Sequence, residues 1–567
     1  MPQTPTPPPT YITTPIYYVN DRPHIGHCYT TLLADYLARF HRMVRGLPTA
    51  GGPGSSGQVF MLTGTDEHAE KVVTTAASHG LSPIQWADQN AAAFQQVFTE
   101  LGYTFDDFIR TTQERHKTRV SGYLRKLLEK GDIARGEFEG WYDVNEEAYV
   151  TETKAKEQNY VSAVTGRPLV RRKEPNYYFK LSKYQAWLEQ SISNGTIRVE
   201  PEARRNEVLG RLREGLQDVP ITRPVTDDPA TQFGIRMPGD EGHRIYVWID
   251  ALFNYLTAVD TPERRHLWPP TVHLMGKEIL WFHAVIWPAM LHALGEPLPR
   301  MIYAHSHYTR DGKKMSKTLG NFIDLETIRA YAAWAPNKDK LPVTVDALRW
   351  YLLTQGPLSA TDADFSHAKF VEVYNADLAN GIGNCASRVG NMIDKYFGGV
   401  MPDHMGRLTH EVTEKATETG EVHHVFDWPK FIEASVRDTI AAVEQCDIAR
   451  ALGHAVDLVR QVDIYINATR PFSLAKLVDK GEASREGLGQ ILYHCAEAVR
   501  VASLLMAPAI PAKMEALWRT WSCAPPAGVP LTELARFAGP HALKPGQAIT
   551  KGEILFMRAD GAVPPPA

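Results

Sequence analysis

Cysteine pairs, long apolar runs and excess charge are all scarce in this chain of 567 residues. None of its five cysteines belongs to a Cys-x-x-Cys pair, so neither a disulfide framework nor a thiolate zinc site is indicated. No apolar run reaches the roughly 18 residues of a membrane span, which argues against membrane association. The formal net charge is only −4, so any nucleic-acid surface must be a local patch of lysine and arginine.

Length and terminal composition set further limits. A chain of this size suggests three or four folding units, each with its own core. Residues 1–10 are rich in proline and threonine and lack basic or apolar character, so we expect a disordered tail rather than a targeting peptide. We therefore expect a cytoplasmic location.

The first candidate site lies where a strand is followed by a helix. β-Branched and aromatic residues predict a strand over 10–19, and apolar residues at helical spacing predict a helix over 27–45. His24, Gly26 and His27 then fall at the helix N-terminus, where unpaired N–H groups attract phosphate. The imidazoles can donate to phosphoryl oxygens, and Gly26 lets a nucleotide approach the backbone. The alternative is a pair of capping or surface histidines.

The second candidate site is a basic segment past the middle of the chain. Glycines bracket residues 311–320 (DGKKMSKTLG), which predicts a mobile loop rather than a helix. Lys314 and Lys317 could follow the charge that develops on a leaving pyrophosphate and so stabilise a transition state. The alternative is a solvated basic loop.

The order of the elements predicts the fold. Residues 11–125 alternate strands (10–19, 58–63, 107–111) with helices (27–45, 67–79, 83–101), which is typical of half of a doubly wound parallel sheet. Residues 126–238 break this pattern and predict an inserted domain. Residues 239–325 return to β-favouring segments at 246–249, 273–274 and 302–304 and complete the sheet. We expect a linking segment at 326–368.

The C-terminal part has a different character. Residues 369–545 carry apolar stripes at helical spacing, which predict an all-α bundle, and residues 546–567 form a C-terminal extension. The stripes are Leu378, Ile382, Cys385, Val389 and Met392; Leu452, Ala455, Val459, Val462 and Ile466; and Leu488, Leu492, Cys495 and Val499. The expected fold class is thus α/β, with a split Rossmann-type sheet, an inserted connective domain and a helical bundle.

Taken together, the two basic motifs resemble a known family. His24-Ile25-Gly26-His27 and Lys314-Met315-Ser316-Lys317-Thr318 are similar, in this order, to the HIGH and KMSKS motifs of the class I aminoacyl-tRNA synthetases. Within that class, the methionine-specific synthetases are most similar. The further stretches that carry this resemblance are Thr13 to Asn20, Gly64 to His68, Phe108 to Thr112, Tyr246 to Ala251 and Gly276 to His283.

The resemblance implies an activity and partners. The chain is expected to activate L-methionine with ATP and Mg²⁺, forming methionyl-adenylate and pyrophosphate, and then to transfer methionine to the 3′ end of tRNA(Met). The tRNA-binding barrel that some members append is absent, so a monomer is expected.

The resemblance also assigns roles to residues. Asp66 follows the apolar strand 59–62 and is expected to hold the substrate ammonium; its alternative is a helix N-cap. The remaining methionine contacts implied are Ile16, Tyr18, Trp248, Ala251, Leu252, Tyr255, Ile279 and His283. The ATP contacts implied are His24, Gly26, His27, Gly276, Glu278, Lys314 and Lys317, of which His24, His27, Lys314 and Lys317 are catalytic. The anticodon contacts implied are Asn384, Arg388 and Phe472.

Each assignment has a plainer alternative. Trp248 and Tyr255 could be core aromatics and His283 a core histidine with both nitrogens bonded. Asn384 and Arg388 lie one helical turn apart beside an apolar stripe, so they could form a solvated helix face, with Phe472 packing inward.

Several positions depart from the family pattern. Phe472 stands after Pro471 where the family has a stacking tryptophan, Thr318 replaces a serine, Ala69 a glycine and Glu278 an aspartate. Asp143 and Glu146 stand where many members have their first zinc-binding cysteine pair, and two carboxylates make a poor zinc site. We therefore expect no structural zinc.

Two rival functions stay open at this point. One is another class I synthetase or a small-molecule nucleotidyltransferase on the same fold, although a nucleotidyltransferase would have no use for the long helical bundle. The other is an inactive tRNA-binding paralogue, against which the intact phosphate motifs and Asp66 argue.

Overall fold

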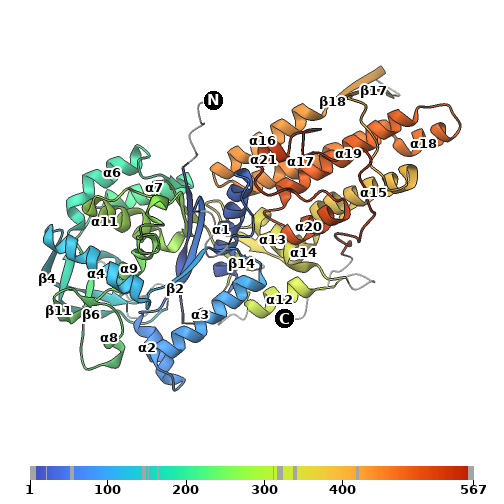
Figure 1. The fold of residues 1–567 in the computed structure, drawn as a ribbon. Helices are drawn as coiled ribbons and strands as arrows, with labels where there is room; N and C mark the ends of the chain where they lie inside the picture. The colour runs from blue at the N-terminus through green and yellow to red at the C-terminus, as the bar shows by residue number, and fades with distance from the viewer. Residues whose placement is uncertain are drawn as a thin grey trace. The chain divides into compact units, whose positions relative to one another are not determined.

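The computed structural model describes residues 8–20, 22–51, 57–143, 148–150, 152–162, 165–310, 312–315, 323–335, 341–416 and 420–559 (Figure 1). The chain forms two compact units. Unit 1 comprises Met1–Arg22, Phe60–Gln96 and Asp106–His305, and unit 2 comprises Pro23–Val59, Val97–Phe105 and Ser306–Ala567. None of the helices in the described ranges combines the length and apolar character that crossing a bilayer requires.

Unit 1 is built on a six-stranded sheet with the order β3-β2-β1-β12-β13-β7. Its strands are β1 (Thr10–Tyr18), β2 (Val59–Asp66), β3 (Asp107–Arg110), β7 (Val199–Glu200), β12 (Val272–Gly276) and β13 (Ile302–His305). The pairs β2–β3, β1–β12, β12–β13 and β13–β7 are parallel. From β1 the chain first adds β2 and β3 on one side and later β12 and β13 on the other, so the strand order reverses between β1 and β12.

Burial explains why these segments are strands. Every residue of β2 and of β12 is buried, as expected for central strands covered on both faces. The core that they share with the surrounding helices includes Tyr11, Leu62, Ile109, Met275 and Ala304. This parallel sheet with helices confirms the split Rossmann-type fold class.

Helices and smaller sheets surround the central sheet of unit 1. In Figure 1, α4, α9 and α11 lie on the same side of the blue strands. The helices are α2 (Glu70–Ser78), α3 (Pro83–Glu100), α4 (Glu114–Glu129), α5 (Glu152–Glu157), α6 (Gln185–Ser193), α7 (Glu202–Leu212), α8 (Pro229–Gln232), α9 (Val247–Leu252), α10 (Asn254–Thr257) and α11 (Trp287–Leu294). A π-helical turn, η4 (Phe282–Ile286), precedes α11.

Two small antiparallel sheets lie in the chain between β3 and β12. One has the order β5-β4-β6-β8 and the other β10-β11-β9. Their strands are β4 (Ile133–Asp143), β5 (Ala148–Val150), β6 (Val170–Phe179), β8 (Val219–Pro220), β9 (Thr222–Pro224), β10 (Arg236–Met237) and β11 (Asp240–Ile245). Their antiparallel pairing contrasts with the parallel sheet that the flanking segments build.

Unit 2 begins with α1 (Ile25–Val44) and continues after β13. A three-stranded sheet of order β15-β14-β16 contains β14 (Tyr308–Arg310), β15 (Lys313–Lys314) and β16 (Ala363–Phe365). The bundle helices α15, α17 and α19 run side by side (Figure 1). The helices from α12 onward are α12 (Leu325–Ala333), α13 (Thr344–Gln355), α14 (His367–Val373), α15 (Asn384–Phe397), α16 (Trp428–Glu444), α17 (Ile448–Thr469), α18 (Pro471–Asp479), α19 (Arg485–Met506), α20 (Pro511–Thr520) and α21 (Leu531–Leu534), with the π-helical η5 (Tyr374–Gly383) before α15.

The predicted apolar stripes form the interior of this bundle. All fourteen stripe residues are buried. Leu378 and Ile382 lie in η5 and the other three residues of the first stripe in α15, while the second stripe lies in α17 and the third in α19. The helical bundle of the expected fold class is therefore confirmed.

The structure corrects three expectations. Residues 246–249 are not a strand: β11 ends at Ile245 and α9 begins at Val247, because a short apolar run suits a buried helix as well as a strand. Lys313 and Lys314 pair with Arg310 and Thr309 as a strand rather than a loop. The segment 369–545 is also not entirely helical, since β17 (Thr409–Ala416) and β18 (Gly420–Asp427) form an antiparallel hairpin.

A buried ionic network ties α1 to the rest of unit 2. The Asp35 carboxylate accepts hydrogen bonds from Arg39 at 2.9 Å, from Arg349 at 2.6 Å and from the Thr104 hydroxyl at 2.7 Å. Arg349 also donates to the carbonyls of Leu101, Pro508 and Ala509. Burial disfavours the charged form of Asp35, yet Arg39 and Arg349 hold its pKa at about 2.

Arg349→Met tests whether this network holds unit 2 together. The substitution removes one of the two guanidinium partners of Asp35 and leaves three buried carbonyls without their donor. Breaking a buried pair in this way costs about 3–5 kcal/mol of unfolding free energy. We expect a clearly lower urea midpoint at pH 7, measured by circular dichroism.

The pH dependence has a defined sign. The pKa of Asp35 in the folded chain, about 2, lies below its unfolded value of about 4, so its stabilisation is complete above about pH 4 and is lost as the pH falls toward 2. The difference between Arg349→Met and the wild type should therefore shrink across that range. Arg460→Met, which removes an exposed pair with Asp457, is the control and should leave the midpoint unchanged. Equal effects of the two variants would contradict the prediction.

Candidate active site

The carboxyl ends of three strands meet where the strand order of unit 1 reverses. β1 ends at Tyr18, β2 at Asp66 and β12 at Gly276, and the sheet order places these strands side by side. Open parallel sheets bind their ligands at such a reversal point. The structure thus brings three of the sequence-predicted site positions to one edge of the sheet.

Asp66 is a buried carboxylate at this edge. Asp66 is 2% exposed. The pKa of the nearby Tyr255 hydroxyl lies far above its ordinary value, chiefly because the hydroxyl is buried and in smaller part because of the Asp66 charge. The alternative that Asp66 caps the following helix is wrong, because α2 begins only at Glu70 and its N-cap residue is Ala69. A buried carboxylate near a phenol hydroxyl is suited to binding an ammonium group.

Aromatic side chains form one wall of the site. The ring of Trp248 stacks on Phe282, with centroids 4.4 Å apart, and Tyr18 meets Trp248 edge-on at 5.8 Å. Trp248 and Tyr18 are partly exposed rather than core residues. Phe282 was not among the predicted site residues, although it lies within the stretch 276–283 that carries the family resemblance. Such a wall suits an apolar, polarisable side chain.

A tyrosine–histidine pair forms the polar part of the site. The Tyr255 hydroxyl lies 2.7 Å from His283 Nε2, and His283 Nδ1 lies 3.0 Å from the carbonyl of Ile279. The carbonyl can only accept, so Nδ1 carries the proton and Nε2 accepts from Tyr255. Burial lowers the pKa of His283 to about 4, so the ring is neutral at pH 7. Both ring nitrogens are therefore bonded, and the ring is fixed in the π-helical turn η4.

The remaining predicted methionine contacts differ in exposure. Ala251 and Leu252 are buried on α9, the helix that also carries Trp248. Ile16 on β1 and Ile279 before η4 are partly exposed and pack against the core of unit 1. All nine predicted methionine contacts lie in unit 1.

Gly276 and Glu278 adjoin each other at the end of β12. A Cβ atom at Gly276 would lie 2.5 Å from a carboxylate oxygen of Glu278, so any larger residue there would require the Glu278 side chain to move. Glu278 is exposed. The pair offers a carboxylate and an open stretch of backbone at the same strand end.

The predicted phosphate motif at the start of α1 is confirmed as a helix N-terminus. His24 is the N-cap residue, and its Nδ1 accepts from the Gly26 amide at 3.1 Å. His27 Nδ1 in turn accepts from the His24 amide at 3.3 Å. A neutral imidazole whose Nδ1 accepts carries its proton on Nε2, so each ring retains an Nε2–H donor. Burial, and then the neighbouring His24, lowers the pKa of His27 well below its ordinary value.

The capping and phosphate-binding interpretations of the two histidines are therefore compatible. Gly26 is required for this arrangement, since a Cβ atom there would lie 2.9 Å from the His24 ring. The two rings lie 3.8 Å apart between centroids, so both imidazoles lie side by side at the helix N-terminus.

The lysine motif is only partly described. Lys314 lies on β15, and Lys317 falls outside the described residues. The chain immediately after this segment returns to α1: the Ile25 amide donates to the carbonyl of Ile323 at 3.2 Å, and His24 and Asp324 form a β-bridge. Both motifs belong to unit 2.

Sequence reasoning missed a buried histidine–carboxylate cluster. His68 Nδ1 and His116 Nε2 donate to the two oxygens of Asp250, at 2.6 and 2.7 Å, and the Thr257 hydroxyl bonds the other nitrogen of His116. Burial disfavours the Asp250 carboxylate, yet the two histidines hold its pKa at about 2. His68 and Asp250 both lie in stretches that carry the family resemblance, which was the available signal.

Arg223 is a second residue without an assigned role. It is 4% exposed, and its guanidinium lies 4.1 Å from the centre of the Tyr246 ring. Arg223 lies on β9, which pairs with β11, the strand that leads into α9. It is therefore a buried cation of unit 1.

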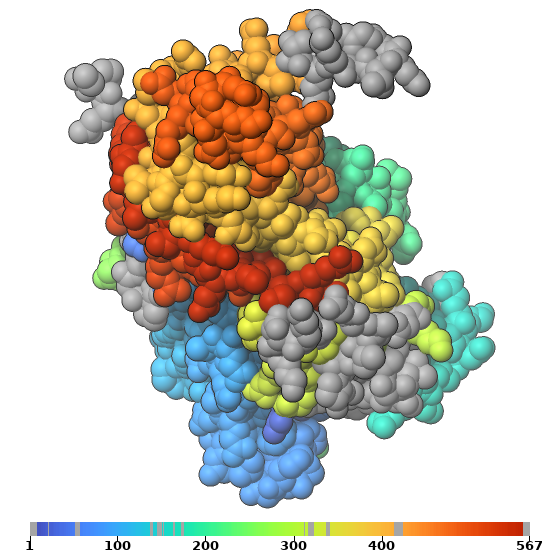
Figure 2. Space-filling view, turned by 90° about the vertical axis from the view of Figure 1, so that its right-hand side faces the viewer, coloured from blue at the N-terminus to red at the C-terminus, as the bar shows by residue number. Residues whose placement is uncertain are grey.

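The three predicted anticodon residues lie in unit 2. Asn384 is exposed at the start of α15, and Arg388, one turn later, donates to Asp463 of α17 at 2.7 Å. Phe472 is 45% exposed at the start of α18 rather than packed inward, which excludes that alternative for its side chain. Figure 2 shows the orange surface of α18 with the gold surface of α15 below it.

Known proteins resemble the chain over most of its length. The family model for class I tRNA synthetases (M) matches residues 10–158 and 156–390. The methionine–tRNA ligase of Streptomyces coelicolor is 37% identical over 562 residues, which cover 97% of this chain and 96% of that protein. The methionine–tRNA ligase of Caldanaerobacter subterraneus is 36% identical, covering 97% of this chain and 79% of that protein.

A solved structure agrees with these relatives. The Mycobacterium tuberculosis methionyl-tRNA synthetase in complex with methionyl-adenylate superposes with a TM-score of 0.81 at 30% identity, covering 97% of this chain and 99% of that one. The motif order, the strand reversal and these matches agree. The chain belongs to the methionine–tRNA ligase family of class I tRNA synthetases.

Proposed function

We propose that the chain activates L-methionine with ATP and transfers it to tRNA(Met). The observation that carries this proposal is the convergence of Asp66, the Tyr18–Trp248 wall and the Tyr255–His283 pair at the strand reversal of unit 1. Asp66 binds the substrate ammonium. Ile16, Ala251, Leu252 and Ile279 enclose the side chain, and the aromatic wall contacts its sulfur.

A size match alone would select methionine poorly. One methylene is worth only roughly 1–3 kcal/mol in an apolar pocket, a rule illustrated by sister synthetases. The Tyr255–His283 pair, whose polar atoms bond each other and the Ile279 carbonyl, adds polarisable ring surface that suits the methionine sulfur better than a shorter aliphatic side chain would. The stacked Trp248–Phe282 pair defines where the end of the side chain lies.

Adenylate formation needs charge stabilisation and no side-chain nucleophile. The methionine carboxylate attacks the α-phosphorus of ATP, which breaks the bond to pyrophosphate. The Nε2–H groups of His24 and His27, together with Lys314 and Lys317, stabilise the charge on the phosphoryl oxygens, and Mg²⁺ accompanies ATP. Gly276 and Glu278 contact the adenosine side. Because His24 and His27 are neutral donors, they require no proton release when phosphate leaves.

The second step uses tRNA. The terminal hydroxyl of the tRNA attacks the carbonyl of methionyl-adenylate and releases AMP. Asn384, Arg388 and the exposed ring of Phe472 bind the anticodon, since amide, guanidinium and aromatic groups suit unpaired bases. A monomer in the cytoplasm is the proposed state of the protein.

We also propose that the chain needs no structural zinc. Its five cysteines, Cys28, Cys385, Cys446, Cys495 and Cys523, all lie outside the segment 126–238. In that segment Asp143 offers a hard oxygen ligand, and Glu146 falls outside the described residues. Zinc prefers thiolate and imidazole donors at structural sites, so this donor set does not fit it.

Amino-acid-dependent ATP–pyrophosphate exchange tests the proposed function. With each of the twenty amino acids in turn, we expect exchange with methionine alone, because only methionine satisfies both the aromatic wall and Asp66. Exchange that is strongest with another amino acid would indicate a different synthetase. Absence of exchange, with tRNA binding retained, would indicate an inactive paralogue.

Lys317→Ala tests the electrostatic role of the lysine motif. We expect kcat of methionine-dependent exchange to fall by about 10²–10³, the usual cost of losing one donor to a developing charge, with little change in KM for methionine. Lys313→Ala is the matched control, because Lys313 is exposed on β15 and has no assigned role. An unchanged rate in Lys317→Ala would defeat the assignment.

Asp250→Asn tests whether the buried cluster positions the methionine site. Asp250 and Trp248 lie on the same helix, and His68 follows Asp66 by two residues, so the cluster links the two sides of the pocket. An asparagine has one acceptor oxygen where two histidines donate, so one of these bonds must be lost. We expect KM for methionine to rise on the order of 10-fold, with KM for ATP unchanged.

A second histidine–aspartate pair of unit 1, in which the histidine is buried and the aspartate is partly exposed, supplies the control. Asp240 accepts from His243 at 2.9 Å, and its other hydrogen-bond donors in the described part of the chain are Tyr177 and Gly242, which lie outside α9. Asp240→Asn should leave both KM values unchanged. If Asp250→Asn alters the two KM values equally, Asp250 has only a general structural role.

A further inference from the structure

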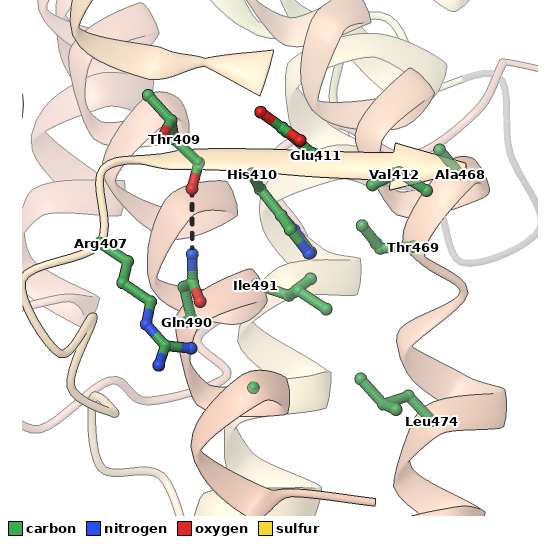
Figure 3. Close-up of a pocket in the computed structure, with 11 residues that line it drawn as sticks. Arg407, Thr409, His410, Glu411, Val412, Ala468, Thr469, Leu474, Gln490 and Ile491 are labelled. Carbon is green, nitrogen blue, oxygen red and sulfur yellow. Dashed lines mark hydrogen bonds between the residues drawn. The ribbon is translucent and has the colours of Figure 1, made fainter. Parts of the chain in front are cut away.

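A pocket of about 550 Å³ opens in the helical bundle of unit 2. It lies between the first strand of the hairpin, β17, and the helices α17, α18 and α19 (Figure 3). Its lining includes Arg407, His410, Leu474, Gln490 and Ile491. None of Asn384, Arg388 and Phe472, the proposed anticodon contacts, belongs to that lining.

A buried amide faces this pocket. Gln490 is 5% exposed, and its Nε2 donates to the backbone carbonyl of Thr409 at 3.3 Å. This bond fixes the orientation of the amide and leaves the Oε1 atom as an acceptor. In Figure 3 the amide lies beside the Arg407 guanidinium on one side of the pocket. A ligand here meets an acceptor for an amino group and a cation side by side.

The N-terminus of α19 also lies at the pocket. Ser484 caps this helix of 22 residues by accepting from the Gly487 amide at 3.3 Å, and Gly487 lines the pocket. The positive end of the helix dipole and the Arg407 guanidinium together favour an anion. Arg407 is exposed, and its guanidinium makes no hydrogen bond or ion pair with the residues that the structure describes.

The other charged and titratable groups are compatible with an anion. Burial lowers the pKa of His410, which is bonded through Nδ1 to the Tyr465 hydroxyl at 2.6 Å, so this ring is neutral. Glu411 also belongs to the lining, but it is exposed, and its carboxylate lies on the other side of β17 from His410 in Figure 3. Ile491 and Leu474 supply apolar surface across from Arg407.

We propose that this pocket binds one unstacked nucleotide of the tRNA, distinct from those that meet Asn384, Arg388 and Phe472. Its phosphate lies against Arg407 and the start of α19, its base packs on Ile491 and Leu474, and an exocyclic amino group donates to Gln490 Oε1. The inference rests on the proposed function, which supplies the RNA.

Continuity with the proposed anticodon surface favours RNA as the source of the nucleotide. Phe472 and Leu474 belong to the first turn of α18 and lie about 200° apart around its axis. An RNA loop that stacks a base on the exposed Phe472 therefore reaches the pocket by passing over a single helix. Single-stranded RNA offers unstacked bases and phosphates together, which matches the lining.

Filling the pocket tests the proposal. Gly487 lines the pocket, and a Cβ atom added there would meet only the Cβ of Ser484, at 4.0 Å, so Gly487→Leu adds a side chain at the pocket with space for its Cβ. Gly453→Leu is the matched control, because Gly453 lies in α17 and its added Cβ would meet no atom within 4 Å. Both changes replace a helical glycine by a better helix former.

The expected result separates this site from the catalytic one. Gly487→Leu should raise KM for tRNA in aminoacylation roughly ten-fold, as the loss of one base contact would, and should leave methionine-dependent pyrophosphate exchange unchanged. Gly453→Leu should change neither. An unchanged KM for tRNA in Gly487→Leu overturns the inference, whereas the absence of exchange in the wild type would instead refute the proposed function.

Two further variants distinguish the phosphate from the base. Arg407→Gln should weaken tRNA binding and lower the slope of log Kd against log salt by about 1, since one phosphate contact is lost. Gln490→Leu should weaken binding without changing that slope. If neither variant weakens tRNA binding, the proposed contacts are wrong. This conclusion holds even if Gly487→Leu raises KM for tRNA.

Calorimetry with nucleoside monophosphates identifies the source of the nucleotide. We expect no measurable binding of AMP or CMP to the pocket at concentrations that saturate tRNA, because a single contact contributes only part of the affinity for RNA. Tight monophosphate binding that Gly487→Leu abolishes, with unchanged affinity for tRNA, would make the pocket a free-nucleotide site and overturn the proposal.

Discussion

The reversal of strand order between β1 and β12 is the constraint on which the site of unit 1 depends. Parallel strands all present their carboxyl ends at the same edge, and at a reversal the following segments turn to opposite sides and leave room for a ligand. Tyr18, Asp66 and Gly276 occupy these ends although they are up to 258 residues apart in the chain. The pairing of β1 with β12 at Ile12–Val272 and Thr13–His273, rather than closeness in the chain, brings Tyr18 and Gly276 together.

Charge at the two candidate sites is controlled in different ways. In unit 1, Asp250 keeps its charge because two histidines donate to it, while burial keeps His283 neutral and outweighs the opposing effect of its bond to Ile279. In unit 2, the histidines at the start of α1 are neutral because their Nδ1 atoms accept backbone N–H groups. One consequence is that neither site depends on a histidine changing its charge near pH 7, which suits electrostatic stabilisation rather than acid–base catalysis.

The sequence was sufficient for the features that depend on local pattern and on family resemblance. Short-range residue patterns predict the helix N-terminus at His24, the strand before Asp66 and the three apolar stripes of the bundle. Residues 246–249 were wrongly expected to be a strand, because Tyr, Val, Trp and Ile favour strands, whereas the chain is helical from Val247 onward. The role of His68 was also beyond the sequence alone, since its partner Asp250 is 182 residues away. The pocket beside Gln490 could not be predicted from the sequence, because it depends on the position of the hairpin, which no helical pattern reveals.

The bundle surface poses a further physical question about how Arg388 can bind RNA. Its guanidinium already donates to Asp463, a partly buried carboxylate. Burial raises the pKa of Asp463, and Arg388 offsets only part of that rise. Removing the arginine from this pair would leave Asp463 without its cation at a site where charge is disfavoured, so exchange of partners is costly. A guanidinium has five N–H donors, however, and the bond to Asp463 uses one of them. Arg388 can therefore keep its ion pair and still present N–H groups to a base, and Asp463 then fixes the direction from which that base must approach.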